Sequence, residues 1–277
     1  MKKIKIDIVM WAKDGAKTLP LALKCIEKAI PKEVLNRKIF VDDHSIDNTV
    51  QIAKSYGWTI YKNTKGFIYG GMREAIKHVS THYFASFEQD LFLSKNWWKG
   101  ISEYIKDPKV AIVCGAQVYY PSPKTINAIS NFYSEELSKF DFPCSLDNTI
   151  YQTEIIRNIG IPNTPIFLDV EICKRVKDAG YKIIRVGNIK SLHYRKNSLE
   201  IFRHNYKYGT MKKESLYNKI RFIQLIKSVI KQIRNLFKIF KIMLKTKCPT
   251  ILIYLPLERL IWIKTFKERR KYWQKKR

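Results

Sequence analysis

Short apolar runs and longer helical patterns alternate along the first 120 positions of the chain. Runs that are rich in β-branched and aromatic residues predict strands, and segments with apolar residues every three or four positions predict helices. The predicted strands are 4–10, 38–41, 58–61, 83–87 and 110–119, and the predicted helices are 18–30, 48–56, 70–79 and 94–105. Alternation of this kind indicates an α/β domain with a mostly parallel sheet that is covered by helices on both faces.

The pattern is less regular from 121 to 163, where Pro, Ser and Asn interrupt two short helical patterns. We interpret this region as an insertion or a loop region. A helix that ends at a glycine is predicted at 168–180, and two strands are predicted at 181–186 and 189–194. His193 then lies near the end of the second strand, where a single His is more often structural than a ligand.

Acidic residues directly follow two of the predicted strands. Asp42 and Asp43 follow the strand KIFV, and Glu88 and Asp90 follow the strand YFASF. Ligands of an open parallel sheet bind at the carboxyl ends of its strands, so both pairs are expected to face one cleft. Their oxygens suit Mg²⁺ or Mn²⁺, and a divalent cation that carries a diphosphate would relieve their mutual repulsion. The alternative is that the polar residues at 43–47 only cap the following helix.

Two more acids, Asp169 and Glu171, lie at the start of the helix predicted at 168–180. The helix dipole favours negative charge at this position, so both can be ordinary helix-start residues.

Four segments, in order, resemble the signatures of the inverting family 2 glycosyltransferases, which have the GT-A nucleotide-diphosphosugar fold. The segment VDDHSIDNT at 41–49 resembles VDDGSTDGT, and GGMREAI at 70–76 resembles the helix start of the family. Glu88-Gln89-Asp90 stands at the DxD metal motif, and LDVEICKRVKDAGYKI at 168–183 resembles the segment with the catalytic acid. The resemblance spans about residues 4–195 and implies transfer of a sugar from a nucleoside diphosphate sugar.

The resemblance also implies roles in nucleotide-sugar binding. Asp43 would hydrogen-bond the nucleobase, and Asp42 would support that loop. Trp11 lies near the first nucleotide-contacting loop, where its ring would stack on the base. Arg73 would lie near the diphosphate, together with the acids at 88–90.

Metal binding and catalysis are assigned in the same way. Asp90 and Glu88 would bind a divalent metal, Mn or Mg, and His193 matches a further metal ligand of many GT-A enzymes. Asp169 is expected to be the general base, with Glu171 as the alternative or as its partner. Glu88 replaces an Asp of the motif, and Leu168 replaces the Glu that usually precedes the catalytic Asp. These departures raise the alternative of a catalytically degenerate GT-A relative that only binds.

Positive charge is concentrated at the end of the chain. Lys and Arg outnumber Asp and Glu by 52 to 24, and the last 79 residues hold 22 basic and only 4 acidic residues. Within this tail, seven apolar residues recur at steps of three and four: Ile223, Ile226, Ile230, Ile233, Phe237, Phe240 and Leu244. A basic residue directly follows each of the last six. The pattern predicts an amphipathic helix that lies in the plane of an anionic membrane surface. The alternative is that this stripe packs on the catalytic domain or on a second subunit.

We therefore expect a GT-A catalytic domain at 1–200 and a basic, helical, membrane-associating tail at 201–277. The segment at 204–213 resembles one that follows the catalytic core in membrane-associated relatives. Arg203, Lys207 and Tyr208 are then expected on the phosphate or acceptor side of the active site. The alternative is that this segment is an ordinary linker. The expected acceptor is a lipid-linked glycan or a lipid phosphate at the membrane surface.

Composition narrows the remaining classes. A hydrophobic fraction of 45% excludes intrinsic disorder as the main state. Five widely spaced cysteines predict neither a disulfide framework nor a zinc ribbon, and they fit a cytoplasmic protein on the inner face of the membrane. The rival from another class is a nucleic-acid-binding protein that acts through the basic tail. A wide apolar face would be wasted on RNA or DNA, so a nucleic-acid partner is not expected.

Overall fold

The computed structural model describes most of the first 194 residues and a short part of the tail. The described residues are 4–120, 124, 126–128, 131–132, 144–163, 168–194, 237 and 239–253. The chain divides into two compact units, one of residues 1–118 with 134–194 and one of residues 119–133 with 195–277.

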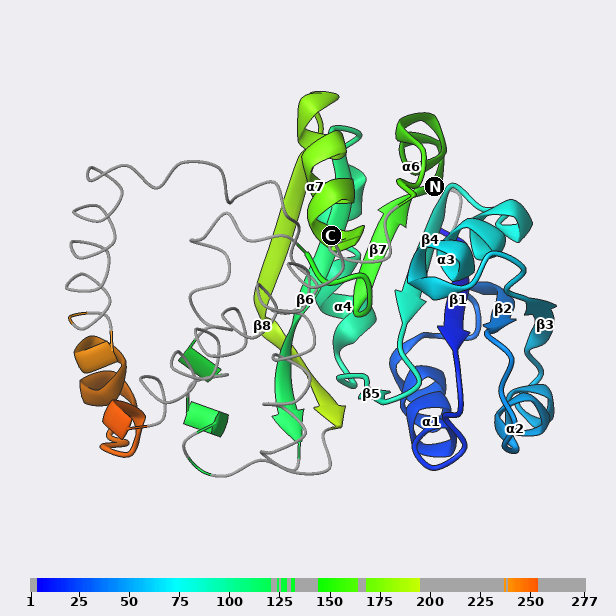
Figure 1. Cartoon of the computed structure of the whole chain (residues 1–277). Helices are drawn as coiled ribbons and strands as arrows, with labels where there is room; N and C mark the ends of the chain where they lie inside the picture. The colour runs from blue at the N-terminus through cyan, green and yellow to red at the C-terminus, as the bar shows by residue number, and fades with distance from the viewer. Residues whose placement is uncertain are drawn as a thin grey trace, which may run out of the picture. The chain divides into compact units, whose positions relative to one another are not determined.

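A single mixed sheet forms the centre of the described α/β structure (Figure 1). Its strands are β1 (Ile6–Ala12), β2 (Leu35–Asp42), β3 (Thr59–Lys62), β4 (Tyr83–Phe87), β5 (Leu91–Phe92), β6 (Val110–Tyr120), β7 (Thr149–Gln152) and β8 (Lys182–Tyr194). They are arranged in the order β3-β2-β1-β4-β7-β6-β8-β5.

The parallel arrangement predicted from the sequence holds for one half of this sheet. β1 pairs in parallel with β2 and β4, and β2 pairs in parallel with β3. In the other half, β7 pairs antiparallel with β4 and β6, and β5 pairs antiparallel with β8. Alternation along a chain does not specify the direction in which a later strand joins the sheet, and β7 lies inside the region that was expected to be irregular.

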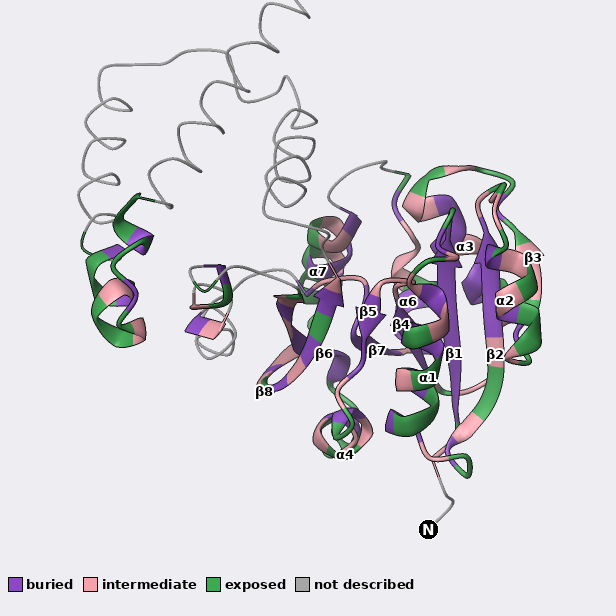
Figure 2. Cartoon of the chain, turned by 90° about the horizontal axis from the view of Figure 1, so that it is seen from below, coloured by how far each residue is buried: buried purple, intermediate pink, exposed green. Residues whose placement is uncertain are grey.

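Helices cover both faces of the sheet, as predicted. They are α1 (Leu19–Ala29), α2 (Thr49–Ser55), α3 (Phe67–His78), α4 (Trp97–Ile101), α6 (Thr153–Ile159) and α7 (Leu168–Asp178), with a 3₁₀ turn at Tyr104–Lys106. Alternate residues of β1 enter two different apolar clusters, because successive side chains of a strand point to opposite faces. Ile8 and Met10 pack with α1 and α4, whereas Val9 packs with α3, α6 and α7. β1 is therefore buried on both sides (Figure 2).

Two predicted elements differ from the structure. The two strands expected at 181–186 and 189–194 are one continuous strand, β8, since pairing within the sheet overrides the break suggested by Gly187-Asn188. The helix expected at 94–105 is limited to α4 and the following 3₁₀ turn.

The described part of the second unit is a short helical segment. Residues 239–246 and 251–253 are helical and are joined by a turn. Ile239, Ile242 and Ile251 of these residues form a small apolar cluster with Cys248 of the turn and with Phe132. Within the ranges that the structure describes, no helix combines the length and the apolar character needed to cross a membrane.

Candidate functional site

Three loops meet at the carboxyl ends of β1, β2 and β4, and hydrogen bonds tie them together. The Gln89 side chain accepts the N–H of Lys13 at 3.0 Å and donates to the carbonyl of Lys13 at 2.9 Å. The N–H of Gly15 donates to the Thr49 hydroxyl at 2.7 Å. A Cβ on Gly15 would lie 2.5 Å from Oε1 of Gln89, so the loops approach as closely as a glycine permits. The sheet edge that the sequence indicated is therefore a connected surface.

The acids after β2 occupy two different environments. Asp42 is 9% exposed, and its carboxylate accepts the N–H of Ser45 at 3.2 Å. Asp43 donates its backbone N–H to Ala12 at 2.8 Å. Its side chain is 28% exposed, and a carboxylate oxygen lies 3.7 Å from Nδ1 of His44. Asp42 thus holds the loop, while the carboxylate of Asp43 reaches the surface.

The role of holding the start of α2 falls to Asp47 rather than to Asp43. The Asp47 carboxylate accepts the N–H of Ala16 at 3.0 Å and the N–H of Thr49 at 2.9 Å. Burial alone would raise the pKa of Asp47, but the hydrogen bonds from Thr49 and Ala16 lower it below its ordinary value. Asp47 therefore links the loops after β1 and β2.

Trp11 and Arg73 both contact neighbouring elements closely. Trp11 is 9% exposed and packs against α3, where a Cβ on Gly71 would lie 2.6 Å from its own Cβ. Arg73 donates to the carbonyl of Ile161 from Nε at 3.1 Å and from Nη2 at 2.6 Å. Its guanidinium also lies 5.5 Å from the ring centre of Tyr69. These contacts brace α3 against β1 and against the segment that follows α6.

A cluster of acids surrounds a buried imidazole where β4 and β8 end. Nε2 of His193 lies 3.2 Å from Oε2 of Glu88 and 3.2 Å from Oδ1 of Asp90. A backbone hydrogen bond of 2.8 Å from Tyr194 to Asp90 fixes these segments beside each other. Asp147 is also buried, and single ligand atoms of Glu88, Asp147 and His193 lie within 4.8 Å of one another. The structure thus brings the three predicted metal ligands together and adds Asp147 as a fourth candidate ligand.

The charges in this cluster depend on each other. Burial disfavours the charged form of His193, but hydrogen bonds to Asp90 and Glu88 outweigh it and raise the pKa of His193 to about 10. Burial, with the nearby charge of Glu88, raises the pKa of Asp147 to about 7. The cluster therefore holds a positive charge at its centre and has excess negative charge around it.

Sequence reasoning missed Asp147 and Gln117, which contacts both Asp147 and His193. Asp147 precedes β7, a strand of four residues in the region that was expected to be irregular. Gln117 lies on β6, where a single polar residue in an apolar strand was the only signal. The positive φ of 57° at Asn148 marks the tight turn that directs Asp147 inward.

The two acids at the start of α7 have different surroundings. Burial raises the pKa of Asp169, and the charge of Glu88 adds to the effect, while backbone hydrogen bonds oppose it. Glu171 is 45% exposed, and its Oε1 lies 3.7 Å from Nε of Arg175, one turn along the helix. Asp169 is therefore the acid that interacts with the cluster, and Glu171 takes part in a surface ion pair.

Residues 7–163 match the profile of Glycosyl transferase family 2, and the match spans more than half of the 277 residues. The chain belongs to this family. It is therefore a glycosyltransferase, as the four motifs predicted. No curated protein sequence matches the glycosyltransferase.

Solved structures with the same fold include two sugar transferases. The mannosyltransferase PcManGT from Pyrobaculum calidifontis, in complex with GDP-Man and Mn²⁺, is 12% identical, with a TM-score of 0.60 over 76% of this chain and 62% of that chain. Glucosyl-3-phosphoglycerate synthase from Mycobacterium tuberculosis, in complex with Mn²⁺, UDP and glucosyl-3-phosphoglycerate, is 14% identical, with a TM-score of 0.52 over 72% of this chain and 75% of that chain. These similarities confirm the predicted GT-A fold.

The acid cluster of the glycosyltransferase fits a divalent cation. Glu88, Asp90 and Asp147 supply carboxylate oxygens, and His193 supplies an imidazole nitrogen. Carboxylate oxygens suit hard divalent cations, and an imidazole nitrogen is a common ligand of divalent transition metals. Three acids around one imidazole also carry a negative charge that a doubly charged cation balances better than a single proton does.

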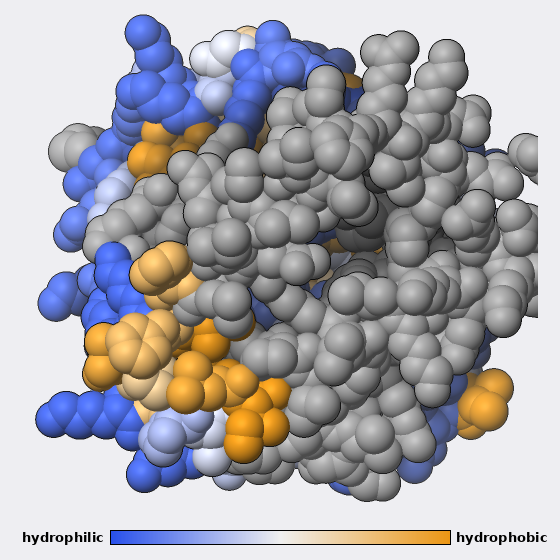
Figure 3. Space-filling view, turned by 60° about the vertical axis from the view of Figure 1, so that its left-hand side comes forward, coloured by the Kyte–Doolittle hydropathy of each residue, from blue (hydrophilic) through white to orange (hydrophobic). Residues whose placement is uncertain are grey.

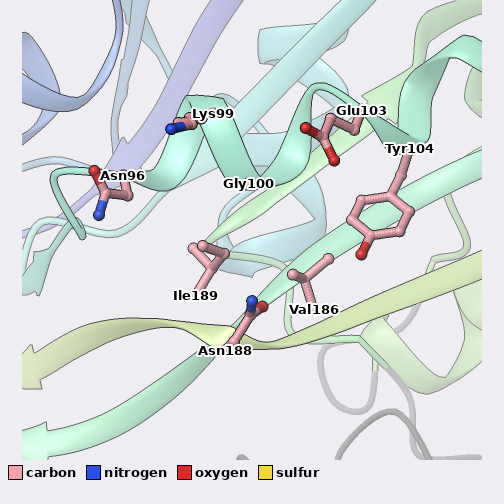
Figure 4. Close-up of a pocket in the computed structure, with 8 residues that line it drawn as sticks. All are labelled: Asn96, Lys99, Gly100, Glu103, Tyr104, Val186, Asn188 and Ile189. Atoms are coloured by element: carbon pink, nitrogen blue, oxygen red, sulfur yellow. The ribbon is translucent and has the colours of Figure 1, made fainter.

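A separate cavity of about 270 Å³ lies between α4 and β8 (Figure 4). Its lining is Asn96, Lys99, Gly100, Glu103, Tyr104, Val186, Asn188 and Ile189. The helix approaches the strand closely at Gly100, where a Cβ would lie 2.3 Å from the Ile189 side chain. None of these residues belongs to the acid cluster, so the cavity forms no part of the candidate site.

The tail predictions are only partly covered by the described residues of the glycosyltransferase. Arg203, Lys207 and Tyr208 lie outside them, as do the first four positions of the predicted apolar stripe. The last three positions, Phe237, Phe240 and Leu244, are 74%, 51% and 60% exposed. The neighbouring Ile239 and Ile242 make the packing contacts instead. Apolar side chains accordingly form a patch on the surface (Figure 3).

Proposed function

We propose that this glycosyltransferase transfers a sugar from a nucleoside diphosphate sugar to an acceptor, with inversion at the anomeric carbon. The observation that carries the proposal is the convergence of Glu88, Asp90, Asp147 and His193 at the carboxyl edge of the sheet. Asp169 lies near enough for the charge of Glu88 to raise its pKa. The GDP-Man and Mn²⁺ bound to PcManGT support the same assignment.

Glu88, Asp90 and His193 are proposed to hold Mn²⁺ or Mg²⁺, with Asp147 as an additional carboxylate. When bound, the cation supplies positive charge that stabilises the leaving diphosphate. The exposed carboxylate of Asp43 is proposed to accept hydrogen bonds from the nucleobase, while Asp42 keeps that loop in place. Trp11 is proposed to shape the donor pocket through its contact with α3, and Arg73, which lies on α3, is proposed to do so through its hydrogen bonds to the carbonyl of Ile161.

Asp169 is proposed to act as the general base. It takes the proton of the acceptor hydroxyl while the acceptor oxygen forms a bond to the anomeric carbon. The bond between that carbon and the diphosphate oxygen breaks, and the nucleoside diphosphate leaves with the electron pair. A carboxylate whose pKa is raised by burial holds the proton more strongly, which favours this step. Glu171, whose carboxylate pairs with Arg175 one turn along the helix, is proposed as the alternative base or as the partner of Asp169.

The tail is proposed to bring the enzyme to an anionic membrane surface on the cytoplasmic side. Phe237, Phe240 and Leu244 expose apolar surface, and Lys241 and Lys245 are exposed on the same helical segment. Apolar side chains beside lysines are typical of helices that lie in the headgroup region. The proposed acceptor is accordingly a lipid-linked glycan or a lipid phosphate.

The donor is tested with a panel of UDP-, GDP- and dTDP-sugars, with and without Mn²⁺. Thermal stabilisation and nucleotide release are measured for the wild type, for Asp90→Asn and for the control Asp178→Asn, whose carboxylate pairs with Lys174 on the surface. One donor is expected to stabilise the wild type and the control in the presence of Mn²⁺ and to be consumed by both, whereas Asp90→Asn loses both effects. Nucleotide binding without turnover would indicate a degenerate enzyme, and no response to any donor would refute the proposal.

Membrane binding is tested by cosedimentation with vesicles of phosphatidylcholine, with and without phosphatidylglycerol. Serine substitutions at Phe237, Phe240 and Leu244 together are expected to weaken binding to the anionic vesicles by at least about tenfold, because full burial of even one apolar side chain contributes about 1.5–3 kcal/mol. The control is Leu21→Ser, which alters an apolar residue of α1 that is 49% exposed. Equal binding by all three proteins would contradict the membrane role of the tail.

A further inference from the structure

Gln117 lies next to the acid cluster and contacts two of its members. Its Oε1 is 2.9 Å from Nδ1 of His193. Its Nε2 donates to Oδ2 of Asp147 at 2.5 Å and to the Ser145 hydroxyl at 3.0 Å. The side chain therefore joins an imidazole and a carboxylate that come from β8 and from the turn before β7.

The chemistry of these partners fixes the orientation of the amide. In its ionised form, which binding to a cation requires, the Asp147 carboxylate accepts hydrogen bonds and donates none, so the end of Gln117 that faces it is the NH₂ group. The carbonyl oxygen then faces His193, and because it only accepts, Nδ1 of His193 must carry a hydrogen. When a cation takes the place of the proton on Nε2, the ring is neutral, and this tautomer leaves the lone pair on Nε2. Nε2 is the atom that lies 3.2 Å from Glu88 and from Asp90.

The backbone around Gln117 is held rigidly against the turn that carries Asp147. The N–H of Gly115 donates to the carbonyl of Asn148 at 2.9 Å, and the Asn148 side chain donates to the carbonyl of Ala116 at 2.8 Å. A Cβ on Gly115 would lie 2.7 Å from the Asn148 side chain, so the two segments are in close contact. Gln117 is consequently presented from a fixed position on β6.

We propose that Gln117 is a positioning residue that holds His193 in its Nδ1–H tautomer and links it to Asp147, so that Nε2 is directed at a divalent cation. This inference rests on the proposed function only in that it needs a cation at the cluster. Groups that hold the second nitrogen of a ligating histidine typically change metal affinity by 10- to 100-fold when they are removed.

The test compares the full-length wild type with Gln117→Met, which keeps a long side chain but has no amide. Mn²⁺ affinity is measured by calorimetry, and electron spin echo spectra of the Mn²⁺-loaded proteins report coupling to an imidazole nitrogen. Gln117→Met is expected to bind Mn²⁺ about 10- to 100-fold more weakly and to lose the imidazole coupling. The matched control, Ser145→Ala, removes a different partner of the same amide and should keep both properties.

A second variant separates the two hydrogen bonds. Gln117→Glu keeps an acceptor toward His193 and removes the donor to Asp147, so it should retain the imidazole coupling even if Gln117→Met fails to fold. Loss of the coupling in this variant, or wild-type affinity and coupling in Gln117→Met, would overturn the proposed role of Gln117 and leave the proposed metal site unaffected. Absence of Mn²⁺ binding by the wild type, with or without nucleotide, would instead overturn the proposed metal site and this role with it.

Discussion

Asn148 joins three strands from a fully buried position, so its replacement tests the packing around the site. Its side chain donates to the carbonyl of Ala116 at 2.8 Å and accepts the Ser191 hydroxyl at 3.1 Å. Its φ of 57° lies in the left-handed region, which costs alanine roughly 1–2 kcal/mol and glycine almost nothing. Two substitutions can therefore separate the hydrogen bonds from the backbone conformation.

Both Asn148→Gly and Asn148→Ala leave a buried carbonyl and a buried hydroxyl without one partner, at about 1–3 kcal/mol for each group. We expect Asn148→Gly to lower the free energy of unfolding by about 2–6 kcal/mol. Asn148→Ala should lower it by about 1 kcal/mol more, because of its positive φ.

Urea unfolding, followed by tryptophan fluorescence, measures these differences. The control is Asn188→Ala on β8, where the side chain is exposed and the free energy of unfolding should change by less than about 0.5 kcal/mol. The reasoning is wrong if the glycine variant is as unstable as the alanine variant, or if neither differs from the control.

Three further predictions concern activity and the fit of α3. Asp169→Asn should lower kcat by about 10²- to 10⁴-fold for a hydroxyl acceptor, while Asp178→Asn on the same helix should not; a small effect would point to an acceptor that is already ionised, such as a phosphate. The pKa of Asp169 is raised, so the base is ionised only above that raised value. A plot of kcat/KM against pH should therefore fall on the acidic side at a pH above the ordinary carboxyl value of 3.8. A fall only near pH 3.8 would contradict the assignment. Gly71→Ala should destabilise the protein by about 1–3 kcal/mol, as seen in the melting temperature, because its Cβ would lie 2.6 Å from Cβ of Trp11; an unchanged melting temperature would show that α3 moves freely.

The sequence was sufficient for the elements whose pattern is local. The acids after β2 and β4 could be placed at one edge because parallel strands end together, and this depends only on the order of the elements. The helix α7 could be predicted from its period, although the pattern did not distinguish Asp169 from Glu171. That distinction depends on burial near Glu88, and burial is a property of the packed structure.

Other parts of the site depend on contacts between distant segments. Gln117 and Asp147 are 30 positions apart, and they meet only because β7 pairs with β6. β7 is too short to produce a clear alternation in a region rich in Pro, Ser and Asn. In the tail, the expected apolar stripe included Phe240, yet the residue that packs inward is Ile242, since the position of Phe132 decides which side of the helix is covered.

The pairing of β5 with β8 has a consequence for cation selectivity. Leu91 stands opposite His193 in this pairing, and the N–H of Tyr194 donates to the carbonyl of Asp90. The separation of the imidazole from the acids is therefore set by the register of two strands, and a slip of one residue would turn His193 to the other face of the sheet. In the proposed cation site, the backbone therefore limits how far His193 and Asp90 can move apart around one ion. We expect Ca²⁺, which prefers a wider and more flexible shell, to bind there more weakly than Mn²⁺.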